Sequence, residues 1–231
     1  MDKNNPIIIS LGGSLVVPNN GIDTEYLSAF NLFIREKIKS GFKFFIVVGG
    51  GTLARKYIDA GKKVIGSLTD WDLDWLGIHS THLNAHLIRT IFRDIAHPRI
   101  IENYEKKVYH LKEKLVVAAG WKPGCSTDFD AVTLAKDYGA EIVINMSNIE
   151  TVFESDPKIN PTAKPIHNIK WNEFKKLVGS SWQPGKSMPF DPIATRLAAE
   201  LNLRVYVVGK DLINLDKILN GRDFLGTIIS S

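Results

Sequence analysis

Two short glycine clusters are the residues of this sequence best suited to chemistry. They are Gly12-Gly13-Ser14 and Gly49-Gly50-Gly51-Thr52, and each follows a short apolar run. Glycine lets the backbone approach a phosphate closely, and exposed N–H groups together with a helix N-terminus attract an anion. Tight-turn geometry alone would explain one such cluster. Two clusters on neighbouring strands predict adjacent phosphate sites, as a phosphoryl transferase needs for its donor and its acceptor.

An arginine accompanies the second cluster. Arg55 follows Gly51 by four residues and falls in the first turn of an expected helix. Its guanidinium fork is therefore expected to meet the phosphate that the second cluster binds. The alternative is an ordinary exposed arginine on a helix surface.

Two further glycine patterns imitate other nucleotide sites. Gly49-x-Gly51-x-x-Ala54 matches a loose dinucleotide fingerprint, with Asp70 or Asp72 near the acidic position, so a nicotinamide or flavin enzyme stays a minor alternative. Gly185-Lys186-Ser187 resembles the end of a P-loop. The first glycine of that motif is replaced by Ser180 and no β-branched strand precedes it, which excludes a P-loop here.

Three histidines share one face of a long expected helix. His79, His82 and His86 are three and four residues apart, a spacing that suits a transition metal. The same face borders the apolar stripe of that helix. We therefore expect a packing surface between subunits, with metal binding as the alternative.

The elements that position these residues alternate along the chain. Short apolar runs predict strands at 7–11, 44–48, 108–111, 115–118, 141–146, 204–208 and 226–229. Asp23 or Thr24 is expected to cap a helix that ends at Gly41. Apolar stripes predict further helices near 53–60, 73–95, 131–138, 171–178, 192–201 and 214–220. This alternation predicts an α/β sandwich whose mostly parallel sheet is covered on both faces, with ligands at the carboxyl ends of the strands.

The composition excludes several classes of protein. The 231 residues include 29 Lys and Arg against 25 Asp and Glu, a net charge of +4, and the basic residues occur in scattered pairs, so we expect no nucleic-acid partner. The single cysteine, Cys125, allows no internal disulfide and favours a reducing compartment. No apolar stretch approaches the ~18–20 residues of a membrane span or the core of a signal peptide. We expect a soluble cytoplasmic protein with no membrane partner.

Six motifs occur in the order found in a known enzyme family. They are Leu11-Gly12-Gly13-Ser14-Leu15, Val47-Val48-Gly49-Gly50-Gly51-x-Leu53-Ala54-Arg55-Lys56-Tyr57-Ile58, Asp74-Trp75-Leu76-Gly77-Ile78, Pro123-Gly124-Cys125-Ser126-Thr127-Asp128-x-x-Ala131, Ser147-Asn148-Ile149-Glu150-Thr151-Val152-Phe153-x-x-Asp156-Pro157 and Asp191-Pro192-Ile193-Ala194. The chain thus resembles the amino acid kinase family, and within it the archaeal-type uridylate (UMP) kinases, over nearly its whole length. The resemblance implies a three-layer αβα sandwich. It further implies a single domain over residues 1–231, with an acceptor half at about 1–120 and an ATP half at about 121–231, and a homo-oligomer, either hexamer or dimer.

The resemblance also implies an activity and its binding residues. The γ-phosphoryl of ATP would pass to UMP to give UDP, with ATP and Mg²⁺ as cofactors and no metal assigned to protein side chains. The donor phosphates would lie at Gly12, Gly13 and Ser14, and the UMP phosphate at Gly50, Gly51 and Arg55. The nucleoside ribose would meet Asp74 and the acceptor base Thr127, while ATP would be held by Asn148, Phe153 and Asp156.

Two aspartates complete the implied catalytic group. Asp128 resembles the residue that orients the groups around the moving phosphoryl, and Asp191 lies in a segment that lines the same cleft. Each also has a structural alternative, because both stand where they could cap a following helix. Asp156-Pro157 likewise could be only a turn.

The sequence departs from the family pattern at Ser10. Many members have a lysine two residues before the first glycine pair, pointing at the transferred phosphate. Such a contact to the transition state is worth ~3–4 kcal/mol, so another cation is expected to replace it. We assign this role to Lys186, in the loop before Asp191, with Lys56 as the alternative.

A second departure lies beside the expected acceptor base. Trp121 stands where the family has a small hydrogen-bonding residue, so either the base stacks on its ring or the pocket takes another acceptor. Glu150-Thr151-Val152 also replaces the family's Asp-Gly-Val on the ATP side.

Because of these departures, two alternatives to a UMP kinase stay open. One is a kinase of another small phosphate, phosphonate or carboxylate, and the other is a non-catalytic relative that binds a nucleotide or oxyanion for storage or regulation.

Overall fold

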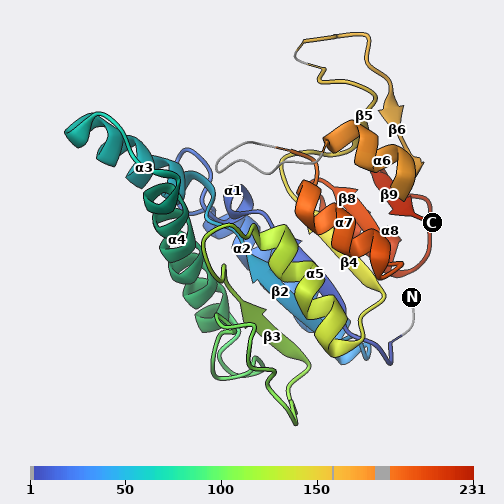
Figure 1. Ribbon diagram of the computed structural model, residues 1–231. Coiled ribbons are helices and arrows are strands. Elements are labelled where there is room, and N and C mark those ends of the chain that lie inside the picture. Colours follow the sequence, from blue (N-terminus) through green and yellow to red (C-terminus); the bar gives the residue numbers. More distant parts are fainter. Residues whose placement is uncertain (1–2, 158, 180–187) are drawn as a thin grey trace.

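A seven-stranded sheet forms the centre of the molecule (Figure 1). The computed structural model describes residues 3–157, 159–179 and 188–231. The sheet contains β1 (Ile7–Leu11), β2 (Phe44–Val48), β3 (Leu115–Ala118), β4 (Ile142–Met146), β7 (Asn168–Lys170), β8 (Arg204–Val208) and β9 (Thr227–Ser230). Their order across the sheet is β3-β2-β1-β4-β8-β9-β7, and every neighbouring pair is parallel except β8 and β9. The mostly parallel sheet predicted from the sequence is confirmed.

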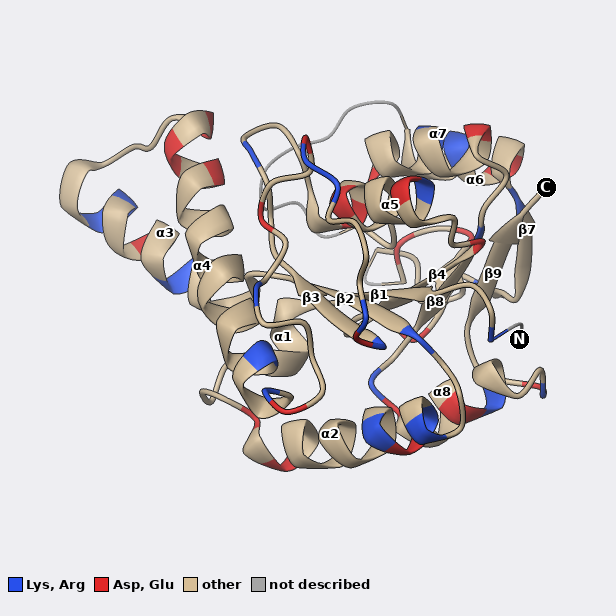
Figure 2. Ribbon diagram, turned by 90° about the horizontal axis from the view of Figure 1, so that it is seen from below, with Lys and Arg blue, Asp and Glu red and all other residues tan. Residues whose placement is uncertain are grey.

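Helices cover both faces of this sheet. They are α1 (Gly13–Val16), α2 (Thr24–Lys39), α3 (Gly51–Ile65), α4 (Asp70–Ile91), α5 (Thr127–Tyr138), α6 (Trp171–Val178), α7 (Pro192–Glu200) and α8 (Leu212–Leu219). Figure 2 shows α5, α6 and α7 on one side of the strands and α2 and α8 on the other. Two apolar cores fill the space between these layers. The arrangement is the expected three-layer αβα sandwich.

The central strands explain why the site lies where it does. Every residue of β1 and β2 is buried, as expected for strands covered on both faces. Ile9 of β1 packs into the core with α2 and α8, and Ile8 packs into the opposite core with α5 and α7. Ser10 is the one polar residue of β1 and is only 3% exposed. Its side chain lies on the α5 side of the sheet, where it meets Asp128.

Helix starts follow the capping chemistry of the sequence. The Asp23 side chain accepts the Tyr26 N–H and begins α2, as predicted. Thr69 and Asp72 form a reciprocal capping box, so α4 begins a few residues earlier than predicted. The Ser126 side chain accepts the Phe129 N–H and caps α5. This helix therefore begins at Thr127 and not at Ala131.

The strand predicted at 108–111 is wrong. The Val108 N–H donates to the Tyr138 hydroxyl at 3.0 Å, so this backbone is not available to a sheet. His110 has a φ of +58°, outside the extended region, and Tyr109 is 71% exposed. Instead, Ala96 and Ile101 form isolated parallel β-bridges with β3.

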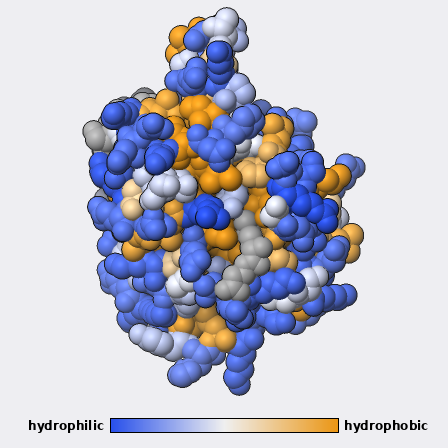
Figure 3. Space-filling model, turned by 90° about the vertical axis from the view of Figure 1, so that its right-hand side faces the viewer, coloured by the Kyte–Doolittle hydropathy of each residue, from blue (hydrophilic) through white to orange (hydrophobic). Residues whose placement is uncertain are grey.

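Two hairpins project from the body of the molecule (Figure 1). One consists of α3 and α4, and in α3 only Thr52 is buried, while Val64 is 83% exposed. The other is the two-stranded pair β5 (Val152–Phe153) and β6 (Pro165–Ile166), whose connecting segment stands clear at the top of Figure 3. Among the described residues, none of the helices has the length and apolarity that crossing a membrane requires.

Candidate active site

The two glycine clusters emerge side by side because their strands are paired. Leu11 at the end of β1 lies opposite Val48 at the end of β2, and the Gly49 N–H donates to the Leu11 carbonyl at 2.9 Å. Both clusters therefore leave the sheet at the carboxyl ends of central strands, the edge at which parallel sheets bind ligands. The predicted adjacency of the two loops is confirmed.

The loops are in backbone contact with each other. A Cβ atom added to Gly13 would lie 2.3 Å from the Gly49 carbonyl oxygen, and one added to Gly51 would lie 2.2 Å from the Gly13 carbonyl carbon. Gly51 also has a φ of +60°, a conformation that costs other residues about 1–2 kcal/mol. We call this contact between Gly13, Gly49 and Gly51 the glycine interlock. It fixes the distance between the two expected phosphate sites through main-chain atoms alone.

Arg55 joins the two loops through their hydroxyl groups. Its Nη2 donates to Thr52 Oγ1 at 2.6 Å and reaches Ser14 Oγ at 3.3 Å. The residue is exposed, so the rest of the guanidinium fork stays open to solvent and to an anion. Arg55 thus lies beside the second cluster, and its contact with Ser14 of the first cluster was not predicted from the sequence. Its phosphate contact stays a prediction.

The side chain of Asn84, on α4, supports the second glycine cluster. The sequence patterns did not predict this role. Its Nδ2 donates to the carbonyls of Gly49 at 2.9 Å and Gly50 at 3.1 Å, and the residue is 2% exposed on α4. These two bonds hold the Gly49 and Gly50 carbonyls against α4 and so fix the course of the loop. No sequence signal distinguishes this asparagine, because only the packing of α4 against the loop brings it there.

Asp128 stands at the centre of a small polar network. Its Oδ1 accepts from the Ser10 hydroxyl at 3.0 Å, and its Oδ2 accepts from the Asp191 N–H at 3.1 Å. Burial, together with the negative charge of Asp191, raises the pKa of Asp128 to about 6, although both hydrogen bonds act in the opposite direction. Ser10 thus holds Asp128 directly, at the position where the family resemblance led us to expect a lysine.

Asp191 serves as a helix cap at the same place. Its Oδ1 accepts from the N–H groups of Ile193 and Ala194, both at 2.7 Å, and begins α7. Burial raises the pKa of Asp191 above its usual value, and these hydrogen bonds lower it in part. Asp191 can therefore cap α7 and belong to the site at the same time. Its Oδ1 caps the helix, while its backbone N–H donates to Asp128. Lys186, the predicted replacement cation, lies outside the described residues.

A third carboxylate, Asp130, was also missed from the sequence. Its Oδ2 accepts from the Trp121 N–H at 3.2 Å, and its Oδ1 has no hydrogen-bond partner among the described residues. The residue is fully buried, and burial followed by the charges of Asp128 and Asp191 raises its pKa well above the usual range. Through its bond to the Trp121 N–H, Asp130 holds the segment that contains Trp121.

Trp121 is packed between two side chains. The Lys122 ammonium nitrogen lies 3.7 Å from the centre of its ring, and the Tyr104 ring lies at 5.6 Å. A cation over an indole face is a favourable contact that a stacking base would have to displace. Trp121 thus lies next to Asp130, with Lys122 over its ring, and its contact with an acceptor base stays a prediction.

The predicted ribose and base residues lie on the same side. Asp74 on α4 accepts the Gly124 N–H at 2.8 Å, which ties α4 to the loop before α5, and burial raises its pKa. Thr127 is the first residue of α5 and is partly buried next to Asp128. The structure therefore brings Asp74, Trp121 and Thr127 together around one short loop.

The residues predicted to hold ATP follow β4 along the chain. Asn148 and Asp156 are exposed, and Phe153 belongs to β5. The hairpin of β5 and β6 forms an arm that contains Phe153. This arm is held at its base by Thr227, whose hydroxyl accepts the Val152 N–H at 2.8 Å. The first glycine cluster is tied to the end of β4, since the Gly12 N–H donates to the Met146 carbonyl at 2.8 Å.

The three histidines of α4 have different surroundings. His79 is exposed and its ring stacks on Trp75 at 5.5 Å, while the ring of His82 points to the Gly120 carbonyl, 2.8 Å from its Nε2. His86 is exposed. In the part of the chain that the structure describes, no group of three metal-ligating side chains is suited to hold a metal ion, so the metal alternative gains no support.

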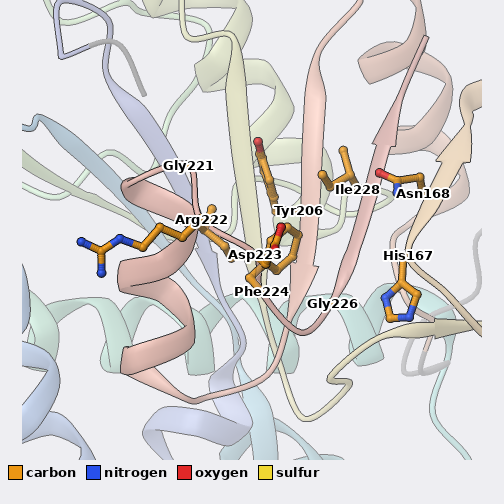
Figure 4. Close-up of a pocket in the computed structure, with 10 residues that line it drawn as sticks. His167, Asn168, Tyr206, Gly221, Arg222, Asp223, Phe224, Gly226 and Ile228 are labelled. Carbon is orange, nitrogen blue, oxygen red and sulfur yellow. The ribbon is translucent and has the colours of Figure 1, made fainter.

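A separate hollow lies far along the sheet from the glycine loops. It has a volume of about 450 Å³ and lies between β8, β9 and the turn after α8, with Tyr206, Phe224 and Ile228 on its apolar side. Figure 4 shows the Arg222 guanidinium pointing away from these rings. None of the predicted site residues that the structure describes lines this hollow, so the candidate site is the region around the glycine interlock.

Comparison with known proteins identifies the class. Two glycine loops at the carboxyl ends of paired parallel strands, with an arginine across both, are typical of a protein that handles two phosphate groups. The family model described as the amino acid kinase family matches residues 5–209. The chain belongs to the amino acid kinase family.

Individual relatives narrow this class. The chain is 31% identical over 220 residues to a uridylate kinase of Pyrococcus abyssi, a match that covers 94% of this chain and 96% of that one. A uridylate kinase of Pyrobaculum neutrophilum is 36% identical over 191 residues, 81% of this chain and 87% of that one. The crystal structure of uridylate kinase from Archaeoglobus fulgidus has a TM-score of 0.82 and 28% identity, covering 97% of this chain and 100% of that one.

Proposed function

We propose that this protein is an ATP-dependent kinase that phosphorylates UMP to UDP. The observation that carries the proposal is the glycine interlock with Arg55 across both loops. In our proposal the two loops and the Arg55 guanidinium bind two phosphate groups, at a separation that the interlock fixes. The uridylate kinases similar to this chain over nearly its full length support the choice of UMP as acceptor.

The reaction needs positioning more than covalent help. An oxygen of the UMP phosphate attacks the γ-phosphorus of ATP, the new P–O bond forms as the bond to the β-phosphate oxygen breaks, and ADP leaves with the charge. In our proposal the first glycine cluster with Ser14 holds the donor phosphates, and Gly50, Gly51 and Arg55 hold the acceptor phosphate. Asp128, held by Ser10 and the Asp191 N–H, orients the groups between them.

The binding residues fit the two nucleotides in chemical type. Asp74 offers a carboxylate to ribose hydroxyls, and Trp121 with Thr127 forms the wall for the acceptor base. Asn148, Phe153 and Asp156 lie on the arm that would cover ATP.

A magnesium ion fits this site on the chemistry of its donors. Kinases hold Mg²⁺ with one or two carboxylates and the substrate phosphates, and Asp128 with Asp191 provides two neighbouring carboxylates. When bound, the ion would neutralise phosphate charge. Lys186 remains our proposed cation for the transferred phosphoryl.

We further propose how the molecule is organised. One continuous sheet joins the acceptor half to the ATP half through the pairing of β1 with β4, which supports a single functional domain. The exposed apolar residues Val64 and Ile65 on α3 support a homo-oligomer. A cytoplasmic location is consistent with the single cysteine.

The test is an ADP-release assay with UMP, CMP and other small phosphates, phosphonates and carboxylates as acceptors. We expect turnover with UMP. Arg55→Ala is expected to raise the KM for UMP at least 10-fold, because charge-assisted hydrogen bonds contribute about 1.5–3 kcal/mol. Lys63→Ala, near the far end of the same helix, is the matched control. Nucleotide binding without turnover on any acceptor would reject the kinase, and turnover on another acceptor alone would reject UMP.

A further inference from the structure

One peptide unit in the acceptor wall is held at both ends by side chains. The unit joins Gly120 to Trp121, and its carbonyl oxygen accepts from His82 Nε2 at 2.8 Å. Its N–H, on the Trp121 side, donates to Asp130 Oδ2 at 3.2 Å. In a trans peptide these two groups point in opposite directions, so α4 and α5 hold the unit from opposite sides.

The neighbouring groups of this segment are held as well. The Gly120 N–H donates to Thr81 Oγ1 at 2.7 Å, and the Ala119 carbonyl accepts from the buried Tyr104 hydroxyl at 2.7 Å. A side chain at position 120 has no room, since a Cβ atom there would lie 2.9 Å from Thr81 Oγ1. The backbone that leads into Trp121 is thus determined almost wholly by side chains of other elements.

His82 is the member of this set that no packing requirement explains. A carbonyl only accepts, so Nε2 carries the proton in this contact. The other ring nitrogen, Nδ1, lies 3.5 Å from Glu102 Oε2, a contact that is attractive only when the ring is protonated. The Gly120 carbonyl is therefore the acceptor that orients the ring. The side chain is 24% exposed and is neither core nor free surface.

We propose that His82 is a positioning residue that sets acceptor selectivity by fixing the Gly120–Trp121 peptide unit. The inference rests on the proposed function, because it takes Trp121 as part of the acceptor wall. The orientation of this unit sets where the Trp121 ring and its covering Lys122 ammonium stand. With the unit held, the wall presents one shape to the base of the acceptor. Without the His82 bond the unit turns about its remaining contacts, and the wall accepts bases less selectively.

The kinetic test compares His82→Ala, His82→Gln and His86→Ala. The glutamine amide replaces Nε2–H as a donor, and His86 is an exposed control on the same helix. In His82→Ala we expect the KM for UMP to rise about 3- to 10-fold, the effect of one lost hydrogen bond, with kcat within about 2-fold. The preference for UMP over CMP falls by a similar factor. His82→Gln restores both, and His86→Ala changes neither. Unchanged KM and unchanged preference in His82→Ala would overturn the proposal.

A spectroscopic test separates this proposal from the proposed function. In protein labelled with ¹⁵N at tryptophan, the Trp121 indole signal is the one that Trp121→Phe removes. We expect this signal to move in His82→Ala and to stay in place in His82→Gln and His86→Ala. A signal that does not move in folded His82→Ala overturns the positioning role, even when UMP is a substrate. If the wild-type protein does not phosphorylate UMP, the proposed function fails, while a moved signal still supports the positioning role alone.

Discussion

The glycine interlock makes a quantitative prediction for Gly51→Ala. The new methyl group would lie 2.2 Å and 2.3 Å from the Gly13 carbonyl carbon and oxygen, where about 3.4 Å is needed, and these main-chain atoms cannot rotate away. The left-handed backbone costs an alanine about 1–2 kcal/mol, and overpacking adds about 1–3 kcal/mol or more. We expect the free energy of unfolding to fall by about 2–5 kcal/mol.

A matched variant separates strain from contact. Gly139 has a φ of +67°, close to the +60° of Gly51, and nothing within 4 Å of an added Cβ. Gly139→Ala should therefore lose only the ~1–2 kcal/mol of backbone strain. Equal losses in the two variants would show that the loops are not in close contact.

The assay combines urea unfolding with kinetics. At roughly 2–4 °C per kcal/mol for a chain of this size, Gly51→Ala should also melt about 4–20 °C lower. Parting the loops by even 1 Å misplaces donor and acceptor, which costs about 100-fold in kcat/KM. A Gly51→Ala enzyme with wild-type turnover would refute the reasoning that the interlock sets the phosphate separation.

Two further predictions concern the carboxylates. If Asp128 acts as a carboxylate, kcat/KM falls as the pH drops through about 6. Ser10→Ala removes a hydrogen bond that lowers this pKa, so the acid limb of the pH profile should move up by about one pH unit; an unmoved limb contradicts this. Asp130 has a raised pKa in the folded state, so its contribution to stability is greatest below the unfolded value of about 3.9 and decreases as the pH rises. Asp130→Asn should match the wild type near pH 4 and be more stable at pH 8 in urea unfolding, whereas parallel curves would contradict the assignment.

The sequence predicted most of the fold because its signals were local. The short apolar runs of β1, β2 and β8 and the cap at Asp23 are read from adjacent residues, and all were found. The strand predicted at 108–111 failed because a distant hydroxyl, that of Tyr138, takes its backbone. Strands of two or three residues, such as β5 and β7, carry too little pattern to be recognised.

The candidate site divides in the same way. Glycine clusters and Arg55 were predicted because an unusual residue type marks them, and strand pairing brings them together. Asn84, Asp130 and His82 were missed as supporting residues because each acts across 9 to 38 residues of sequence, through hydrogen bonds to the main chain. Such contacts depend on the docking of α4 and α5, which no spacing in the sequence encodes.

The sparse burial of α3 has a consequence for how the protein opens locally. Only Thr52 in its first turn is buried, so the outer turns have little apolar contact to hold them. In a lone chain, amide hydrogens near Val64 and Ile65 should exchange with solvent through low-energy fraying, well before global unfolding. The first turn is different, because Gly51 is locked against Gly13 and Arg55 is bonded to Thr52. The residues proposed to bind phosphate therefore lie in the first turn of α3, where we expect slow exchange, while the far end of the same helix frays.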